Sequence, residues 1–471
     1  MGGQVTDAVD ALKSALERSN STVLLPGSDG YEQSLKRWAE SAEKKAAIVV
    51  QPTCAEAVSR AILFAREHGF EIAVKGGGHS TSGSSSTKGG LLVDLSKMRN
   101  VTVVPDGKMI IAEGGTIWED VDLAASEHGL STVGGTVNHT GVGGLTLGGG
   151  YGWLSGLYGL TIDNLLAVEV VLADGHILNA TEDENPDLFW ALRGAGQSFG
   201  VATSFTFRGY TQRDPVWGGL LAFTTDKLQS VVEFANNLAE TTDGQSAIVI
   251  GFAAPAPARK PVVLAVAFYN GPKAEAEEYY KPLLNLNPVL NRTSDMPYKQ
   301  VNAMLNGVST HGDRKTQKGT AFMPPLSQTF AQSLLDDYLA FVRGVPDAIA
   351  SVFLFEYFSQ KKVIEISQTA MSFANRGLHS NILLGLRWTD KDNDAVCREW
   401  ARTEAKKIDA ELKKHIQDSR DGVGQYGNYD GIDAANAWDL FGVNTERVLA
   451  LKNKYDPTNV FRKGAGRLFV E

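Results

Sequence analysis

The segment between residues 47 and 210 contains short apolar runs separated by glycines, a pattern that predicts buried strands. The runs that we interpret as strands cover residues 47–50, 71–74, 91–95, 108–113 and 167–172. Two segments between them, 54–68 and 117–128, carry apolar residues at helical spacing and end before a glycine, as helices commonly do. Together these segments predict an α+β fold in which helices pack on sheets.

After about residue 210 the predicted helices become longer and alternate with apolar strands. The predicted helices cover residues 226–241, 273–280, 325–342 and 392–415, and the predicted strands cover 247–253, 262–269, 350–358 and 381–388. The tail from 439 to 460 has the pattern of a single helix that Asp456-Pro457 closes. These patterns predict a second α+β unit.

Length and charge narrow the classes of protein to which this chain can belong. A chain of 471 residues is too long for one ordinary core, so we expect two or three structural units. The formal net charge of −9 argues against a nucleic-acid-binding surface, which needs a basic stripe. No apolar run approaches the roughly 20 residues that cross a bilayer, so we expect no membrane partner.

Two cysteines cannot form a disulfide framework, although one bridge stays open. The N-terminal segment lacks the apolar core and cleavage site of a signal peptide. We therefore expect a cytoplasmic protein, and a secreted protein numbered from its mature end is the alternative.

A glycine-rich loop that contains a histidine follows the predicted strand 71–74. It reads Lys75-Gly76-Gly77-Gly78-His79-Ser80-Thr81-Ser82-Gly83. Consecutive glycines let a backbone approach a ligand closely, and their N–H groups can form an anion-binding concavity for a phosphate. The imidazole that follows them is a potential nucleophile. The loop therefore indicates a large phosphorylated cofactor that His79 could hold covalently.

Residues 134–152, GGTVNHTGVGGLTLGGGYG, form the densest glycine stretch of the chain. Such a segment is a poor helix and a poor strand interior, so we expect its backbone to pack against a flat ligand or a diphosphate. The alternative is a flexible linker, but linkers rarely carry interspersed Val, Leu, Asn, His and Tyr.

Other cofactor and enzyme classes fit the motifs poorly. The segment 194–200 has the wrong spacing for a dinucleotide fingerprint and follows a helical turn instead of a strand. No Walker loop, His-Glu-x-x-His or cysteine cluster is present, so we expect no metal site. Ser198 has the spelling of a nucleophile elbow, but its predicted strand follows the serine instead of preceding it.

Several motifs in this order resemble the flavin-linked oxidases of the vanillyl-alcohol oxidase and p-cresol methylhydroxylase superfamily, and within it the berberine-bridge-enzyme-like and 6-hydroxy-nicotine-oxidase-like members. The motifs are VVQPT (49–53), GGGHS (76–80), VDL (93–95), the cluster 134–152, YGLTIDN (158–164), DLFWALRGAG (187–196), YGNY (426–429), FG (441–442) and KYDP (454–457). The resemblance covers nearly the whole chain. It implies an FAD-binding domain over 1–210, a substrate domain over 211–421 with an antiparallel sheet covered by helices, and a C-terminal segment, 422–471, that completes the FAD domain.

The resemblance implies FAD as cofactor, joined through its 8α-methyl group to His79. Relatives with two covalent bonds carry a cysteine where this chain has Val137, which cannot form a thioether, so we expect a single bond. Thr140 stands at a position described as gating oxygen access in the family, and its small side chain favours an oxidase. The residues that we expect to contact the cofactor are Lys75, Gly76, Gly77, Gly78, His79, Ser80, Thr81, Gly83, Gly134, Gly135, Thr136, Val137, His139, Thr140, Gly143, Gly144, Gly149, Gly150, Gly152, Asp163, Asn164, Gly200, Val201 and Asn428.

The catalytic residues that we predict lie on two strands and on the Tyr-x-Asn-Tyr segment. If that segment is a strand, Tyr426 and Asn428 share one face and Tyr429 points away. Relatives carry a carboxylate or glutamine base at the position that our register assigns to Leu383, two residues after Asn381. Glu356, inside the aromatic run 353–358, is the candidate substitute, because a buried glutamate must be paired or perturbed.

The implied reaction is hydride transfer from an alcohol or amine C–H of a small organic substrate to the flavin, which O₂ reoxidises with release of H₂O₂. Three alternatives stay open: oxidative cyclisation or rearrangement in secondary metabolism, a carbohydrate oxidase, and a binding protein with no catalysis. The expected partners are the substrate and O₂, and the sequence does not indicate the oligomeric state.

Overall fold

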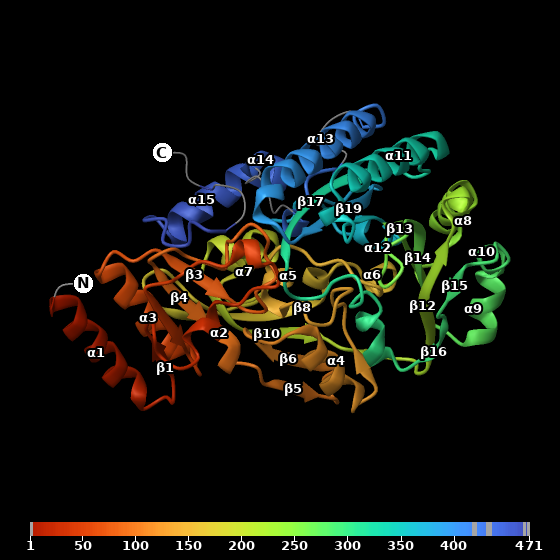
Figure 1. Ribbon diagram of the computed structural model, residues 1–471. Helices are drawn as coiled ribbons and strands as arrows, with labels where there is room; N and C mark the ends of the chain where they lie inside the picture. The colour runs from red at the N-terminus through yellow and green to blue at the C-terminus, as the bar shows by residue number, and fades with distance from the viewer. Residues whose placement is uncertain (1–2, 417–421, 430–435, 465–467, 469–471) are drawn as a thin grey trace.

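The computed structural model of the protein describes residues 3–416, 422–429, 436–464 and 468 (Figure 1). Near the N-terminus a four-stranded sheet has the order β1-β2-β4-β3, in which β2, β4 and β3 run parallel. This part contains β1 (Thr22–Leu24), β2 (Ile48–Gln51), β3 (Ile72–Lys75), β4 (Leu91–Asp94), α1 (Gly3–Glu17), α2 (Tyr31–Leu35) and α3 (Ala55–Glu67). Strand β3 leads directly into the glycine-histidine loop, so this sheet fixes where the loop begins.

An antiparallel five-stranded sheet with the order β5-β6-β10-β8-β9 follows. Its strands are β5 (Val101–Val104), β6 (Met109–Glu113), β8 (Leu165–Val171), β9 (Ile177–Ala180) and β10 (Val201–Arg208). The helices between them are α4 (Trp118–Ser126), α5 (Val142–Leu147), α6 (Ser155–Tyr158) and α7 (Pro186–Ala195), and β7 (Leu130–Ser131) pairs with β11 (Tyr210–Thr211). The second glycine segment therefore runs between α4 and β8.

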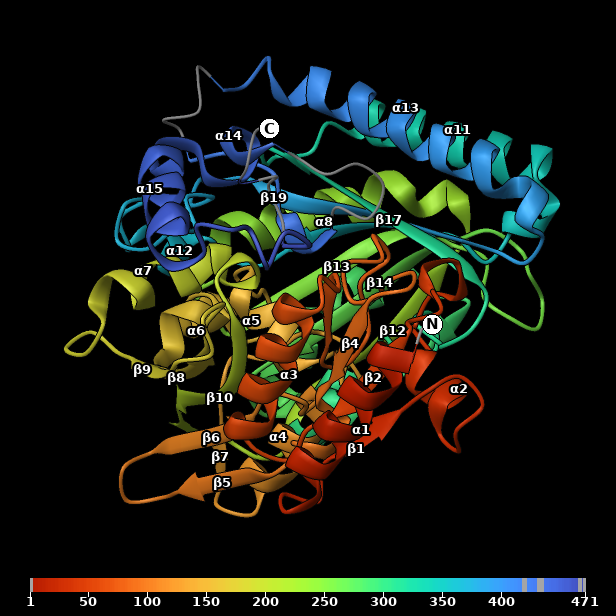
Figure 2. The ribbon, with the colours of Figure 1, turned by 90° about the vertical axis from the view of Figure 1, so that its left-hand side faces the viewer.

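The largest sheet has eight strands, all antiparallel, and the order β15-β12-β14-β13-β18-β19-β17, with β16 paired to β12. The strands are β12 (Val216–Phe223), β13 (Ser246–Ala253), β14 (Val262–Tyr269), β15 (Leu290–Asn291), β16 (Ser294–Met296), β17 (Arg314–Phe322), β18 (Val352–Tyr357) and β19 (Ser380–Trp388). Helices α8 (Leu228–Thr241), α11 (Gln328–Gly344) and α13 (Asp394–Leu412) share one apolar core with this sheet, and Figure 2 shows α11 and α13 side by side along it. Shorter helices of this part are α9 (Lys273–Tyr279), α10 (Lys281–Leu284) and α12 (Lys361–Ile364).

The predicted α+β class, with an antiparallel sheet covered by helices, is confirmed, and each predicted strand and each helix before residue 439 is present within three residues of its expected ends. Three local predictions are wrong. The glycine cluster contains helix α5, and the C-terminal tail forms two helices, α14 (Ala437–Phe441) and α15 (Thr445–Tyr455), separated at Gly442, whose φ is +46°. The Tyr-x-Asn-Tyr segment ends in a 3₁₀ turn over Gly427–Tyr429 instead of a strand.

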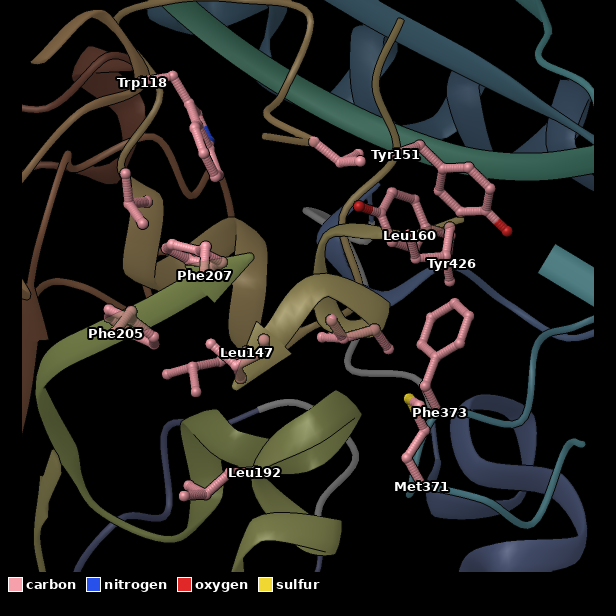
Figure 3. Close-up of a cluster of buried hydrophobic side chains, with 14 of the residues drawn as sticks. Trp118, Leu147, Tyr151, Leu160, Leu192, Phe205, Phe207, Met371, Phe373 and Tyr426 are labelled. Atoms are coloured by element: carbon pink, nitrogen blue, oxygen red, sulfur yellow. The ribbon is translucent and has the colours of Figure 1, made fainter. Parts of the chain in front are cut away.

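Tertiary packing explains why α5 forms in a segment of low helix propensity. Its Val142 is fully buried and Leu147 nearly so, and both belong to the largest apolar core of the molecule. Most helical stability comes from such packing of an apolar face and little from propensity. Figure 3 shows this core, in which Leu147 lies among side chains from distant segments, such as Trp118, Phe205 and Tyr426. The C-terminal segment thus packs into the same core as the N-terminal half.

One buried ion pair joins distant segments, and a second, local one contains a lysine that bonds a distant backbone carbonyl. The Arg376 guanidinium bonds the Asp163 carboxylate, with Nη2 to Oδ1 at 2.5 Å, and both side chains are almost fully buried. Lys452 Nζ on α15 lies 2.6 Å from Asp456 Oδ2 and 2.7 Å from the carbonyl oxygen of Ser198. Removing one partner of such a pair leaves a buried charge uncompensated, which costs more than the pair itself contributes.

We predict that Asp163→Asn lowers the free energy of unfolding by about 3–5 kcal/mol, because it leaves Arg376 without its buried counter-charge. Thermal unfolding followed by circular dichroism measures the loss. Asp183→Asn is the matched control, since the Asp183 side chain is exposed and none of the described ion pairs includes it. A protein of unchanged stability that loses bound flavin would instead assign Asp163 to the cofactor.

Candidate active site

The two glycine-rich segments touch at Gly77 and Gly141. A Cβ atom built on Gly77 would lie 2.4 Å from the Gly141 nitrogen, and one built on Gly141 would lie 2.4 Å from the Gly77 nitrogen. Neither position can carry a side chain unless the backbone of one loop moves. Gly78 and Gly83 have φ values of +71° and +77°, in the left-handed region that glycine adopts without strain. The loop that leaves β3 therefore folds tightly against the start of α5.

This contact brings His79 into a cluster of three histidines. His79 Nε2 lies 2.7 Å from His139 Nδ1, and the ring of His311 packs against both. The indole of Trp38 stacks on His79 with ring centroids 4.9 Å apart. Burial, followed by the neighbouring His139 and His311 and the charge of Lys315, lowers the pKa of His79 well below its usual value. His79 is therefore a neutral imidazole at pH 7.

The three imidazoles could also serve as ligands of a metal ion, since their candidate ligand atoms lie within 4.8 Å of one another. The 2.7 Å separation of the His79 and His139 nitrogens is, however, a hydrogen-bond distance. The arrangement in this structure is thus a hydrogen-bonded imidazole pair with a third ring beside it.

One cavity of about 560 Å³ runs along both glycine segments and continues beneath the large sheet. Predicted cofactor residues that line it are Gly76, Gly77, Gly78, His79, Ser80, Thr81, Gly83, Gly135, Thr136, Val137, Thr140, Gly143, Gly144, Gly200, Val201 and Asn428. Three further predicted catalytic residues, Glu356, Tyr426 and Tyr429, line the same cavity. The fold thus gathers in one place residues as far apart in the chain as Gly76 and Tyr429, which are 353 positions apart.

Other predicted cofactor residues lie outside this lining: Lys75, Gly134, His139, Gly149, Gly150, Gly152, Asp163 and Asn164. Lys75 Nζ donates to the carbonyl oxygen of Ser34 and lies 3.6 Å from the Asp94 carboxylate. The Asn164 carbonyl oxygen accepts a hydrogen bond from the Tyr210 hydroxyl. Protein partners therefore account for the positions of these polar side chains, as they do for Asp163.

The Glu356 carboxylate is the only carboxylate among the described lining residues of the cavity. The side chain is 4% exposed, accepts a 2.6 Å hydrogen bond from the Tyr429 hydroxyl at Oε1, and lies 3.4 Å from Asn381 Nδ2 at Oε2. Burial raises the pKa of Glu356 to about 7, although the two hydrogen bonds oppose this shift. A group with this pKa can accept and return a proton at neutral pH.

The register of the sheet explains why Glu356 and Asn381 meet. Leu354 of β18 pairs with Leu383 of β19, and because the strands are antiparallel, Glu356 comes opposite Asn381. Leu383, where relatives were expected to carry the base, lines the cavity as an apolar residue. The neighbouring strand thus supplies a carboxylate to the part of the cavity where β19 has none.

Tyr429 does not point away from the other two residues of its segment, as a strand would require. Because Gly427–Tyr429 is a 3₁₀ turn, the rings of Tyr426 and Tyr429 lie 4.8 Å apart on the same cavity. Burial raises the pKa of both phenols, so neither is suited to be a base. Asn428 Nδ2 donates to the Leu145 carbonyl of α5 and to the Tyr426 hydroxyl, which fixes the segment against the glycine cluster.

The cavity contains buried polar groups that a polar cofactor could bond. The hydroxyls of Ser85 and Tyr151 are buried in the lining and have no hydrogen-bond partner among the described residues. Buried polar atoms of this kind normally find a partner. Figure 3 shows the Tyr151 ring beside Tyr426, and both belong to this lining. A ligand with several acceptors along the glycine segments would satisfy them.

Sequence reasoning missed the residues that the large sheet, the loop before β17 and the segment after α2 contribute. Trp38, Lys315, Gln317 and Arg387 line the cavity, and His311 lies at its histidine cluster. None belongs to a motif. For Lys315, Gln317 and Arg387 the only signal is the alternation of side chains along β17 and β19, which places every second residue on the cavity face.

Comparisons with known proteins agree with this geometry. Residues 46–181 match the family model described as FAD binding domain, and residues 425–466 match the one described as berberine and berberine like. The FAD-linked oxidoreductase pgmH of Aspergillus terreus is 30% identical over 455 residues, which cover 92% of this chain and 90% of that protein.

Solved structures show the same fold. The 6-hydroxy-D-nicotine oxidase of Arthrobacter nicotinovorans superposes with a TM-score of 0.79 at 24% identity, over 94% of this chain and 97% of that one. The glucooligosaccharide oxidase of Acremonium strictum, described with a 6-S-cysteinyl, 8α-N1-histidyl FAD, gives a TM-score of 0.79 at 20% identity, over 98% and 99% of the two chains. No helix in the described part of this chain is both long and apolar enough to span a membrane.

We predict that Gly77→Ala separates the two glycine segments and lowers the flavin content of the purified protein at least tenfold, because its Cβ would meet the Gly141 backbone. The flavin content is measured as the ratio of the flavin absorbance at about 450 nm to the protein absorbance at about 280 nm. Gly344→Ala, at the end of α11 with open space at its Cβ, is the control. A fully flavin-loaded Gly77→Ala protein would show that the contact is dispensable.

Proposed function

This chain belongs to the FAD-linked oxidoreductases with a berberine-like C-terminal segment, and we propose that it is an oxidase of a small, largely apolar alcohol or amine. The single observation that supports this proposal most strongly is the position of Glu356. It is a buried carboxylate, hydrogen-bonded by Tyr429, in the same cavity as the glycine-histidine loop. When bound, FAD accepts a hydride at its N5 atom and passes both electrons to O₂, which gives H₂O₂.

We propose that His79 holds FAD through one covalent bond at Nδ1. The hydrogen bond to His139 occupies Nε2, so a proton held there leaves the lone pair on Nδ1 free. A neutral imidazole is a competent nucleophile, and the low pKa of His79 keeps it neutral. Val137 lines the cavity where relatives with a second bond carry cysteine, and its side chain cannot form a thioether.

The glycine segments would hold the remainder of the cofactor. Backbone N–H groups of the loop that ends at Gly83 are suited to a diphosphate. The hydroxyls of Ser85 and Tyr151 are free to bond its polar atoms. The tight contact at Gly77 and Gly141 keeps both walls of the site in fixed positions.

Glu356 is the proposed general base. For an alcohol substrate, its carboxylate takes the hydroxyl proton while the C–H hydride leaves. The Tyr429 hydroxyl and the Asn381 amide hold the carboxylate in place and stabilise its charged form. An amine substrate can react in its neutral form without a base.

The lining beside Glu356 favours an apolar substrate. The sheet face of the cavity carries Leu354, Leu383 and Val352. The loop before β17 adds Leu305 and Val308. A carbohydrate would leave most of its hydroxyls without partners on such a surface. The apolar lining therefore supports an alcohol or amine oxidase, or an oxidative cyclisation of an apolar metabolite, more than a carbohydrate oxidase.

We predict that acid precipitation of the wild-type protein gives a yellow pellet, because the flavin is covalently held. His79→Ala moves the colour to the supernatant or abolishes it. His415→Ala, which alters a largely exposed histidine, keeps a yellow pellet. A yellow pellet from His79→Ala would place the bond on another residue.

We predict that kcat/KM for the best substrate in a panel of aryl alcohols rises with pH through an inflection near 7, because Glu356 acts as base only when deprotonated and its pKa is about 7. Glu356→Gln removes the inflection and lowers the rate by a factor of about 10²–10⁴. The readout is peroxide release across pH 5.5–8.5, about 1.5 units on either side of the inflection.

Glu404→Gln is the matched control, because Glu404 is also buried with a pKa raised to about 7 but lies on α13, outside the cavity lining. It leaves the profile unchanged. If Glu356→Gln keeps both the rate and the inflection, the base is another group.

We predict that Tyr429→Phe moves the inflection to higher pH, because the Tyr429 hydrogen bond lowers the pKa of Glu356 and its loss lets burial raise that pKa further. Tyr280→Phe removes a buried hydroxyl that lies in the helix-covered core, outside the cavity lining, and leaves the inflection in place. An inflection that moves to lower pH, or that disappears in Tyr429→Phe alone, would contradict the role given to Glu356.

A further inference from the structure

The cavity face of the large sheet changes in character along its strands. At one end Glu356 lines the cavity, while Asn381, which bonds its carboxylate, lies outside the lining; the middle is apolar. At the other end two cations lie directly opposite each other, because Lys315 of β17 pairs with Arg387 of β19. Like charges in this arrangement repel, so the pair requires an explanation.

Lys315 is an uncompensated charge. Its side chain is 2% exposed, and it makes no ion pair among the described residues. Its ammonium group donates to the carbonyl oxygens of Trp38 and Gly312 and lies 4.7 Å from the centre of the Trp38 ring. Burial and the nearby charge of Arg387 lower its pKa to about 8, so Lys315 is still largely protonated at pH 7.

Arg387 has donors to spare. Its Nε atom lies 2.6 Å from the Asp313 carboxylate, while its two terminal nitrogens make no hydrogen bond within the described part of the chain. Asp313 and the exposed Glu40 are the carboxylates whose charges raise the pKa of Lys315, and neither lines the cavity. Gln317, the next cavity-facing residue of β17, adds a side-chain amide to the same surface. The cavity surface at this end therefore presents positive charge and free N–H donors.

We infer that Arg387, assisted by Lys315 and Gln317, forms a subsite that binds a carboxylate group of the substrate. The planar guanidinium matches a carboxylate with two parallel hydrogen bonds. This inference rests on the proposed function and adds to it the class of substrate: a molecule with an oxidisable C–H at one end, an apolar body and a carboxylate at the other.

The register also limits the length of that substrate. Arg387 lies six residues after Asn381 on β19, a backbone distance of roughly 20 Å at the rise of a strand. The side chains of Glu356, beside Asn381, and of Arg387 shorten this span because both line the cavity. A molecule that touches both ends therefore has the length of two or more linked rings.

Isothermal titration calorimetry of the flavin-loaded protein with biphenyl-4-carboxylate and with its neutral isostere, biphenyl-4-carboxamide, tests the subsite. We expect the carboxylate to bind at least tenfold more tightly than the amide. Arg387→Gln removes this preference by weakening carboxylate binding and leaves amide binding unchanged, and Arg387→Lys retains part of it. Arg398→Gln, which removes a positive charge on α13 outside the cavity, leaves both affinities unchanged.

A gain of affinity distinguishes the subsite from a purely structural role of Arg387. Asp313→Asn releases the guanidinium from its own carboxylate, so we expect tighter carboxylate binding, and asparagine tolerates the positive φ of +58° at this position. Equal affinities for carboxylate and amide, or no binding of either probe, would overturn the inference.

Loss of flavin from Arg387→Gln would also overturn the carboxylate subsite, because it would show that the cations bind the diphosphate of the cofactor. Binding is measured without turnover, so the result does not depend on whether Glu356 is the base. The carboxylate preference can therefore be confirmed even if Glu356 is not the base, and it can fail even if Glu356 is the base.

Discussion

The contact between Gly77 and Gly141 is the constraint on which the rest of the site depends. The two backbones approach so closely that neither residue could carry a Cβ atom, and this fixes the position of one loop relative to the other. That contact sets the start of α5, and α5 in turn supplies the Leu145 carbonyl to which Asn428 bonds. It also places His79 against His139. A glycine pair without any chemistry of its own therefore positions both His79 and the C-terminal tyrosines.

The remainder of the site comes from parts of the chain that have no local reason to meet. The large sheet contributes Glu356, and the C-terminal segment contributes Tyr429, which bonds it. Buried ion pairs such as that of Arg376 with Asp163 hold these parts on the N-terminal half. The charge pattern of the cavity follows from this assembly: among the lining residues that the structure describes, one carboxylate lies at one end, apolar strands form the middle, and cations lie at the other end.

Local patterns were enough to predict most strands and helices, because apolar periodicity and glycine punctuation are local signals. The glycine-histidine loop and Glu356 were also predictable, since a histidine after three glycines and a glutamate within an aromatic strand are conspicuous. The sequence could not show helix α5, whose stability comes from long-range packing. Nor could it show that Tyr429 faces the cavity, or that Lys315 and Arg387 pair across strands, because a turn geometry and a strand register decide both. Asp163 illustrates the converse: it was expected to contact the cofactor, but its carboxylate forms a buried ion pair with Arg376, 213 positions later in the chain.

The most direct test of this account is a crystal structure of the flavin-loaded protein. We expect electron density that joins the flavin to Nδ1 of His79 alone, with Nε2 still at hydrogen-bond distance from His139, and the flavin in contact with both glycine segments at Gly77 and Gly141. A bond from Nε2, a second bond, or a flavin bound away from this contact would contradict it.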